Sequence, residues 1–98
     1  MDETVVLINP FSVPQGMEDE FLKMWKQQAE FMKNQPGFIE TKLHRSLDPA
    51  ARFQFINVAR WESASAWQAA ISKSQIPAQT AQTPFEAHPA LYRIEVQY

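Results

Sequence analysis

The residues best suited to chemistry gather in residues 57–67, which read NVARWESASAW. Phe55, Asn57 and Trp61 share one parity, so in a strand their side chains point to the same face. An amide on an aromatic wall needs a hydrogen-bond partner, because burying it unpaired costs roughly 1–3 kcal/mol. Trp67 lies close enough in sequence to Trp61 for both indoles to meet at one strand–helix junction. We therefore predict an apolar pocket with one polar group here.

Several of these side chains are open to more than one interpretation. The Asn57 amide either bonds to backbone as a structural group or donates to a substrate oxygen. Trp61 can form core, pocket wall or both. His44 and His88 are each possible general bases. The polar parity of its strand favours a solvated His44, whereas His88 lies beside a polar connection that can act as a lid.

Composition excludes several classes of function. The 98 residues include no cysteine, which removes disulfides, thiolate catalysis and cysteine-bound metal sites. A net charge of −2 gives no basic surface for nucleic acid or an anionic membrane. No apolar run reaches the roughly 20 residues of a transmembrane helix, and the acidic start is unlike a signal peptide. We expect one cytoplasmic domain over residues 1–98, with no metal, nucleic-acid or membrane partner.

Hydrophobic patterning predicts four strands and two helices. The predicted strands span residues 4–11, 38–46, 52–61 and 91–98, and the predicted helices span residues 17–33 and 64–71. A stripe of methionine, aromatic and glutamine side chains on the first helix, including Trp25 and Gln28, is typical of core packing. Ser63 is suited to cap the second helix. The polar residues 72–88 form a long connection that can include a short helical turn.

This order of elements is β-α-β-β-α-β, the ferredoxin-like plan. We therefore predict an α+β fold with a four-stranded antiparallel sheet and both helices on one of its faces. The first and third strands are apolar on both parities, since Ile56 and Val58 lie opposite the side of Phe55. The face without helices must then be covered, and a second copy of the sheet is the simplest cover. We predict a homodimer.

The chain resembles the antibiotic biosynthesis monooxygenase family of dimeric α/β barrels. The resemblance covers nearly the whole chain and is carried by PQGME at residues 14–18, PGF at residues 36–38 and NVARWES at residues 57–63. It implies that two ferredoxin-like sheets form a dimeric α/β barrel. The wider superfamily contains oxygenases, haem-degrading enzymes and members of unknown role, so it implies several possible reactions.

Within the polyketide branch of this family, cofactor-free monooxygenases oxidise anthrone-type aromatics to quinones. Their pocket asparagine and tryptophan resemble Asn57 and Trp61, a pocket tyrosine falls on Trp67, and a second tyrosine is replaced by Leu43. The resemblance thus implies a cofactor-independent monooxygenase that uses O₂ to oxidise an electron-rich polycyclic aromatic or quinol. In this hypothesis Asn57 donates to the developing oxyanion, Trp61 packs the rings, and His88 takes the proton.

The candidate substrate-binding residues of this hypothesis are Trp67, Phe55, Asn9 and Trp25. Two alternatives accompany the hypothesis. The haem-degrading branch uses a first-strand asparagine that Asn9 matches, but its histidine ligand falls near Thr80, so His88 would have to replace that ligand. Haem binding or degradation is therefore the first alternative. The second is a non-catalytic dimer that binds a small aromatic molecule.

Overall fold

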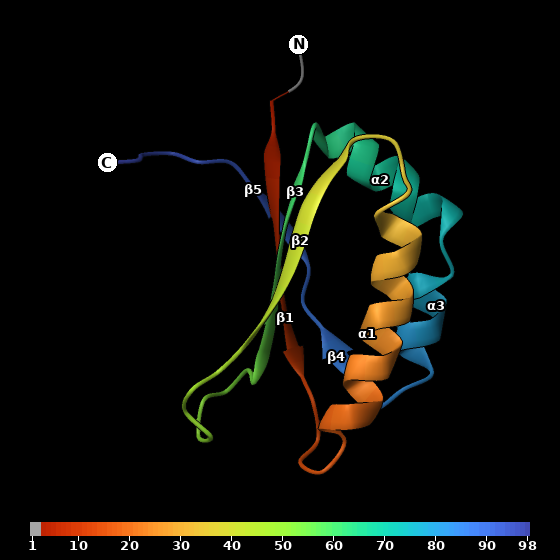
Figure 1. The fold of residues 1–98 in the computed structure, drawn as a ribbon, viewed down its shortest axis with the longest axis vertical. Helices are drawn as coiled ribbons and strands as arrows, with labels where there is room; N and C mark the ends of the chain where they lie inside the picture. The colour runs from red at the N-terminus through yellow and green to blue at the C-terminus, as the bar shows by residue number, and fades with distance from the viewer. Residues whose placement is uncertain (1–2) are drawn as a thin grey trace.

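A computed structural model describes residues 3–98 and shows one five-stranded sheet with three helices on one side of it (Figure 1). In chain order the elements are β1 (Val5–Ser12), α1 (Glu18–Met32), β2 (Phe38–Arg45), β3 (Phe55–Trp61), α2 (Ala64–Lys73), α3 (Ile76–Ala81), β4 (Glu86–Ala87) and β5 (Ala90–Tyr92). The strand order is β2-β3-β1-β4, β5 also pairs with β1, and all pairs are antiparallel. This arrangement confirms the predicted ferredoxin-like α+β fold.

The fourth strand of that plan starts earlier than predicted and is divided in two. β4 places Ala87 opposite Phe11, and β5 places Ala90 opposite Ile8, so both follow the same edge of β1. Pro89 separates them because it has no N–H to give to the ladder. The connection stays on the edge, since the His88 N–H donates to the Pro10 carbonyl at 3.0 Å.

The predicted strand over residues 91–98 is also wrong at its end. β5 stops at Tyr92, which lies opposite Val6, and β1 itself begins at Val5. Residues 93–98 therefore run past the end of β1 and pair with none of the strands described within residues 3–98. Ile94 and Val96 are 66% and 69% exposed, and the segment leads away from the helices (Figure 1).

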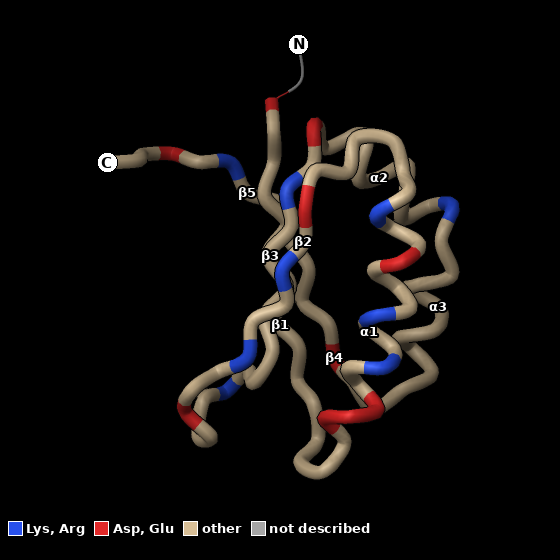
Figure 2. Tube along the Cα trace, in the orientation of Figure 1, with Lys and Arg blue, Asp and Glu red and all other residues tan. Residues whose placement is uncertain are grey.

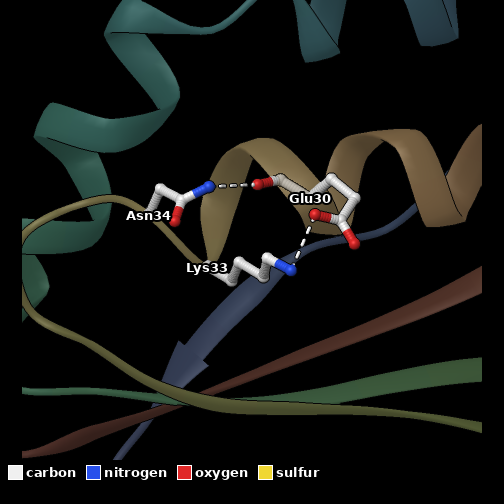
Figure 3. A network of polar contacts seen from close by, with 3 residues as sticks. All are labelled: Glu30, Lys33 and Asn34. Atoms are coloured by element: carbon white, nitrogen blue, oxygen red, sulfur yellow. Dashed lines mark hydrogen bonds and ion pairs between the residues drawn. The ribbon is translucent and has the colours of Figure 1, made fainter.

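The bounds of α1 lie within one residue of the prediction. Its first turn is acidic, which suits the positive end of the helix dipole. Hydrogen bonds from the backbone N–H groups of Glu18 and Gly16 lower the pKa of the Glu18 carboxyl. At the other end, Asn34 Nδ2 donates to the Glu30 carbonyl at 2.9 Å and Lys33 Nζ pairs with the Glu30 carboxylate at 2.7 Å (Figure 3). These contacts stabilise the C-terminal end of α1, just before the turn into β2.

Ser63 caps α2 as predicted, because its Oγ accepts a hydrogen bond from the Ala66 N–H at 3.0 Å. The helix continues to Lys73, beyond its predicted end, and α3 occupies part of the predicted connection over residues 72–88. Within residues 3–98, none of the helices has the length and apolar character needed to cross a bilayer. Charged residues of both signs lie along α1, β2 and the hairpin into β3 (Figure 2).

A tight turn over residues 35–38, with Gly37 at its third position, joins α1 to β2. The Phe38 N–H donates to the Gln35 carbonyl at 3.2 Å, and Gly37 has a φ of +89°. A Cβ atom at Gly37 would lie 2.5 Å from the Cβ of Ala66 on α2. Gly16 has a similar φ of +91°, but a Cβ there would meet nothing within 4 Å. Gly37 is therefore needed both for its backbone conformation and for the close approach of α2.

We expect Gly37→Ala to lower the free energy of unfolding by more than Gly16→Ala does. Both variants place alanine at positive φ, which costs roughly 1–2 kcal/mol. Gly37→Ala adds overpacking against α2, at a further cost of roughly 1–3 kcal/mol. Urea unfolding of the two variants measures the difference. Equal losses would contradict the prediction and show that α2 moves aside freely.

The core consists of two separate clusters of buried side chains. The first, here called the tryptophan cluster, contains Leu7, Ala59, Trp61 and Ala70, with partly buried Met32, Phe38 and Trp67 against it. The second, the phenylalanine cluster, contains Phe11, Phe21, Phe55 and Phe85, with partly buried Trp25 against it. The Phe21 ring is fully buried and lies 4.8 Å from the rings of both Phe11 and Phe55. Both β1 and β3 contribute to each cluster, so residues between the two clusters lie mid-strand.

Candidate functional site

A cavity of about 580 Å³ lies between the sheet and the helices. Its volume falls in the range of small-molecule sites, roughly 300–1,000 Å³. Side chains of α1, α2, α3 and strands β1 to β4 line it, and most of them are aromatic or aliphatic. Glu86 and His88 are the only ionisable side chains in the described lining. Within residues 3–98, no group of three or more His, Asp or Glu side chains is placed to hold a metal ion.

Three amide side chains line this cavity where the two core clusters meet. Asn9 on β1, Asn57 on β3 and Gln28 on α1 each separate, along their own element, members of one cluster from members of the other. Asn9 and Asn57 are direct partners in the β1–β3 ladder, and Asn57 and Gln28 are each 9% exposed. The three amide groups of the cavity thus lie at one level between the two core clusters.

The oxygens of both asparagine side chains already accept hydrogen bonds. Thr41 Oγ1 donates to Asn57 Oδ1 at 2.5 Å, and the His88 backbone N–H donates to Asn9 Oδ1 at 3.0 Å. In the described part of the chain, neither Nδ2 has an acceptor. Two NH₂ groups on neighbouring strands are therefore available to a molecule in the cavity. Such donors can stabilise an oxygen that gains negative charge.

Trp61 and Trp67 supply much of the aromatic wall. Trp61 is 1% exposed and meets the ring of Phe38 edge-on at 5.4 Å between ring centroids. The Nε1 atoms of both indoles are buried and have no acceptor among the described residues. Buried donors without a partner are rare in proteins. An acceptor on a molecule held against this wall would satisfy them.

His88 directly follows β4 and lines the cavity with a side chain that is 47% exposed. Its Nε2 lies 4.0 Å from a carboxylate oxygen of Glu86, and its ring centroid lies 5.5 Å from that of Phe53. Because its backbone N–H is bonded to β1, the residue has a fixed position on the sheet edge. The half-exposed ring therefore lies within reach of both the cavity and water.

The structure brings six of the seven predicted site residues to the cavity lining: Asn57, Trp61, His88, Trp67, Asn9 and Trp25. Phe55 is the exception. It shares the strand face of Asn57, but Phe21 of α1 covers its ring and leaves it 1% exposed. Phe55 thus packs the core beside the cavity and does not form its wall.

The lining residues absent from the predicted site include Thr41 and Gln28, each of which forms a hydrogen bond to another lining side chain. Gln28 Nε2 donates to Thr80 Oγ1 of α3 at 3.4 Å. The sequence contains a signal for Gln28, because it is a polar side chain within the buried stripe of α1. Thr41 has a weaker signal, since it lies on the strand parity opposite to Glu40 and Lys42.

Comparisons with known proteins agree with the fold and with the predicted family resemblance. The family model described as antibiotic biosynthesis monooxygenase matches residues 4–76. A mycobilin-producing haem oxygenase of Mycobacterium tuberculosis is 38% identical over 65 residues, which are 66% of this chain. That match covers 60% of the length of the haem oxygenase.

Solved structures resemble the chain over nearly its whole length. A candidate monooxygenase from Shewanella loihica PV-4 has a TM-score of 0.89 and 37% identity, and the alignment covers 99% of both chains. SnoaB, a cofactor-independent oxygenase from Streptomyces nogalater, has a TM-score of 0.79 and 25% identity, with 97% of this chain and 96% of SnoaB aligned. The similar proteins thus include both a cofactor-independent oxygenase and a haem oxygenase.

Proposed function

The chain belongs to the antibiotic biosynthesis monooxygenase family, and from this premise we propose that it is a cofactor-independent monooxygenase. Its substrate would be a neutral, flat, electron-rich aromatic such as an anthrone or quinol, with O₂ as oxidant. The observation that carries the proposal is the pair of free NH₂ groups, of Asn9 and Asn57, inside an aromatic cavity. The similarity to SnoaB supports it as well.

The proposed reaction needs a substrate that ionises easily. An anthrone loses a proton from its CH₂ group, which moves negative charge onto the carbonyl oxygen, and the anion reduces O₂. In the net change CH₂ becomes C=O, one oxygen atom of O₂ stays in the product, and the other leaves as water. Asn57 and Asn9 would donate to the charged oxygen, and His88 would take the proton. Trp61 and Trp67 would orient the rings and keep water away from them.

Haem binding is the second candidate function. Two observations favour it: the similarity to a haem oxygenase, and a histidine, His88, in the cavity lining. The donor set does not fit haem, however. The described lining contains no lysine or arginine to pair with the two propionates, and Glu86 beside His88 adds another carboxylate. A neutral aromatic needs no such partners and suits this lining better.

We expect the purified protein to consume O₂ with an anthrone when no metal, flavin or haem is added. An oxygen electrode and the absorbance of the quinone product measure the reaction. Titration with haem should give no saturable, stoichiometric Soret shift, because the lining lacks partners for the propionates. A stoichiometric shift that His88→Ala abolishes would reverse the conclusion and make His88 the haem ligand.

We also propose that the protein is a homodimer joined through the sheet face opposite the helices. Because side chains alternate along a strand, Val6, Ile8, Ile56 and Val58 point to the face opposite the cavity-lining Leu7, Asn9 and Asn57. Ile94, Val96 and Tyr98 add exposed apolar side chains in residues 93–98, which pair with none of the described strands. Apolar side chains gathered on a sheet face without helices favour association with a second copy.

A further inference from the structure

We propose that Thr41 is a positioning residue that holds the Asn57 amide with its NH₂ group toward the cavity. The catalytic meaning of this inference rests on the proposed function, whereas the positioning itself does not. Thr41 lies on β2, lines the cavity, and is paired in the ladder with Ala59, the next residue after Asn57 on the same face of β3. Its hydroxyl thus reaches the Asn57 side chain across the two strands.

The geometry of the contact identifies which end of the amide faces Thr41. Thr41 Oγ1 and Asn57 Oδ1 are 2.5 Å apart. That separation suits an O–H···O hydrogen bond, of roughly 2.5–3.0 Å, and is too short for a typical N–H···O bond. Threonine is also stiff about χ1, which keeps the hydroxyl in place. The hydroxyl therefore donates, and the amide oxygen accepts.

The opposite orientation of the amide would leave the proton of the Thr41 hydroxyl without an acceptor. With Nδ2 turned to Thr41, the threonine hydroxyl would become the acceptor, and its own proton would need a new partner. Among the described residues, the Thr41 hydroxyl has no hydrogen-bond partner other than Asn57. The observed orientation pairs the hydroxyl proton and turns the NH₂ group to the cavity, where a bound molecule or solvent can accept from it, so this orientation is preferred. The bond to Oδ1 also polarises the amide, which strengthens its NH₂ group as a donor to a substrate oxygen.

Thr41→Val tests the inference, because valine keeps the shape and removes the hydroxyl. We expect kcat for an anthrone to fall about tenfold, the effect of one hydrogen bond, with a smaller change in KM. Thr41→Ser should restore kcat, since it retains the donor. In an Asn57→Leu background, Thr41→Val should cause no further loss. An equal loss in that background, or failure of serine to restore kcat, would overturn the inference.

Nuclear magnetic resonance of the side-chain amides gives a readout that needs no activity. Asn57→Leu assigns the Asn57 NH₂ pair of signals in ¹⁵N-labelled protein. Thr41→Val should shift or broaden this pair, whereas Thr41→Ser should not. Thr80→Val is the matched control, because Thr80 is another cavity threonine and bonds to Gln28 instead. If the parent protein fails to oxidise an anthrone, the proposed function is wrong. The resonance shifts of the Asn57 amide then remain as the test of the positioning role of Thr41. Unchanged Asn57 signals in Thr41→Val would then refute the positioning role.

Discussion

Asn57→Leu should lower the turnover of an anthrone by roughly 10²–10³ while the protein unfolds at the same or a higher urea concentration. The loss is expected because the Asn57 NH₂ group has no acceptor within the described chain and faces an aromatic cavity. A donor in a site that excludes water stabilises a developing oxyanion far more strongly than it would in water. Stability should hold, because burial of an apolar leucine of similar size between two apolar clusters offsets the loss of the hydrogen bond to Thr41.

Two further variants sharpen this test. Asn57→Asp should be less active than Asn57→Leu, because a carboxylate repels the forming anion. Asn9→Leu should cost less activity than Asn57→Leu, since Asn57 would still donate from the opposite strand. Oxygen uptake per folded molecule and urea unfolding are measured for all three variants. If Asn57→Leu loses several kcal/mol of stability and keeps full activity, Asn57 is a structural amide.

The alternation of residues in the sequence was enough to predict which face of the strand carries the site residues. Asn57 and Trp61 lie on one face of β3 as predicted, because a strand has a strict period of two. Parity alone could not separate Phe55 from them, since what excludes Phe55 from the cavity is the ring of Phe21 on a distant helix. Thr41 was missed for the same reason. Its contact with Asn57 depends on how β2 is aligned against β3, and no local pattern specifies that alignment.

The C-terminal part of the fold shows a different limit of sequence patterns. Ile94 and Val96 alternate as a strand should, yet they lie beyond the end of β1 and remain exposed. The pattern describes what a segment can bury, whereas pairing depends on where the neighbouring strand ends. β4 is too short to show any periodicity, and it forms because Phe11 and Ser12 of β1 are available beside it. α3 has only six residues and none of them is buried, so its bounds could not be predicted from a hydrophobic pattern.

Val58→Lys should convert the protein from a dimer to a folded monomer. Val58 lies half-buried at the centre of the helix-free face, opposite Ile8 in the ladder. In a twofold interface both copies bring the same patch, so each substitution would bury two unpaired charges. Ile56→Lys should act in the same way. Neither variant touches the helix-facing core, so both should keep the far-ultraviolet circular dichroism of the parent protein.

Light scattering at micromolar concentration tests this expectation, since the parent should give about twice the chain mass of 11.3 kDa. Arg60→Lys is the matched control, because it places lysine on the same strand face at a position that is already charged and exposed. Its dimer should persist, since Arg60 already pairs with Glu40 at 3.7 Å and a lysine there adds no buried charge. A monomeric parent protein, or a Val58→Lys variant that stays dimeric, would rule out the helix-free face as the interface. The exposed apolar side chains of Ile94, Val96 and Tyr98 would then have to find their partner on another surface.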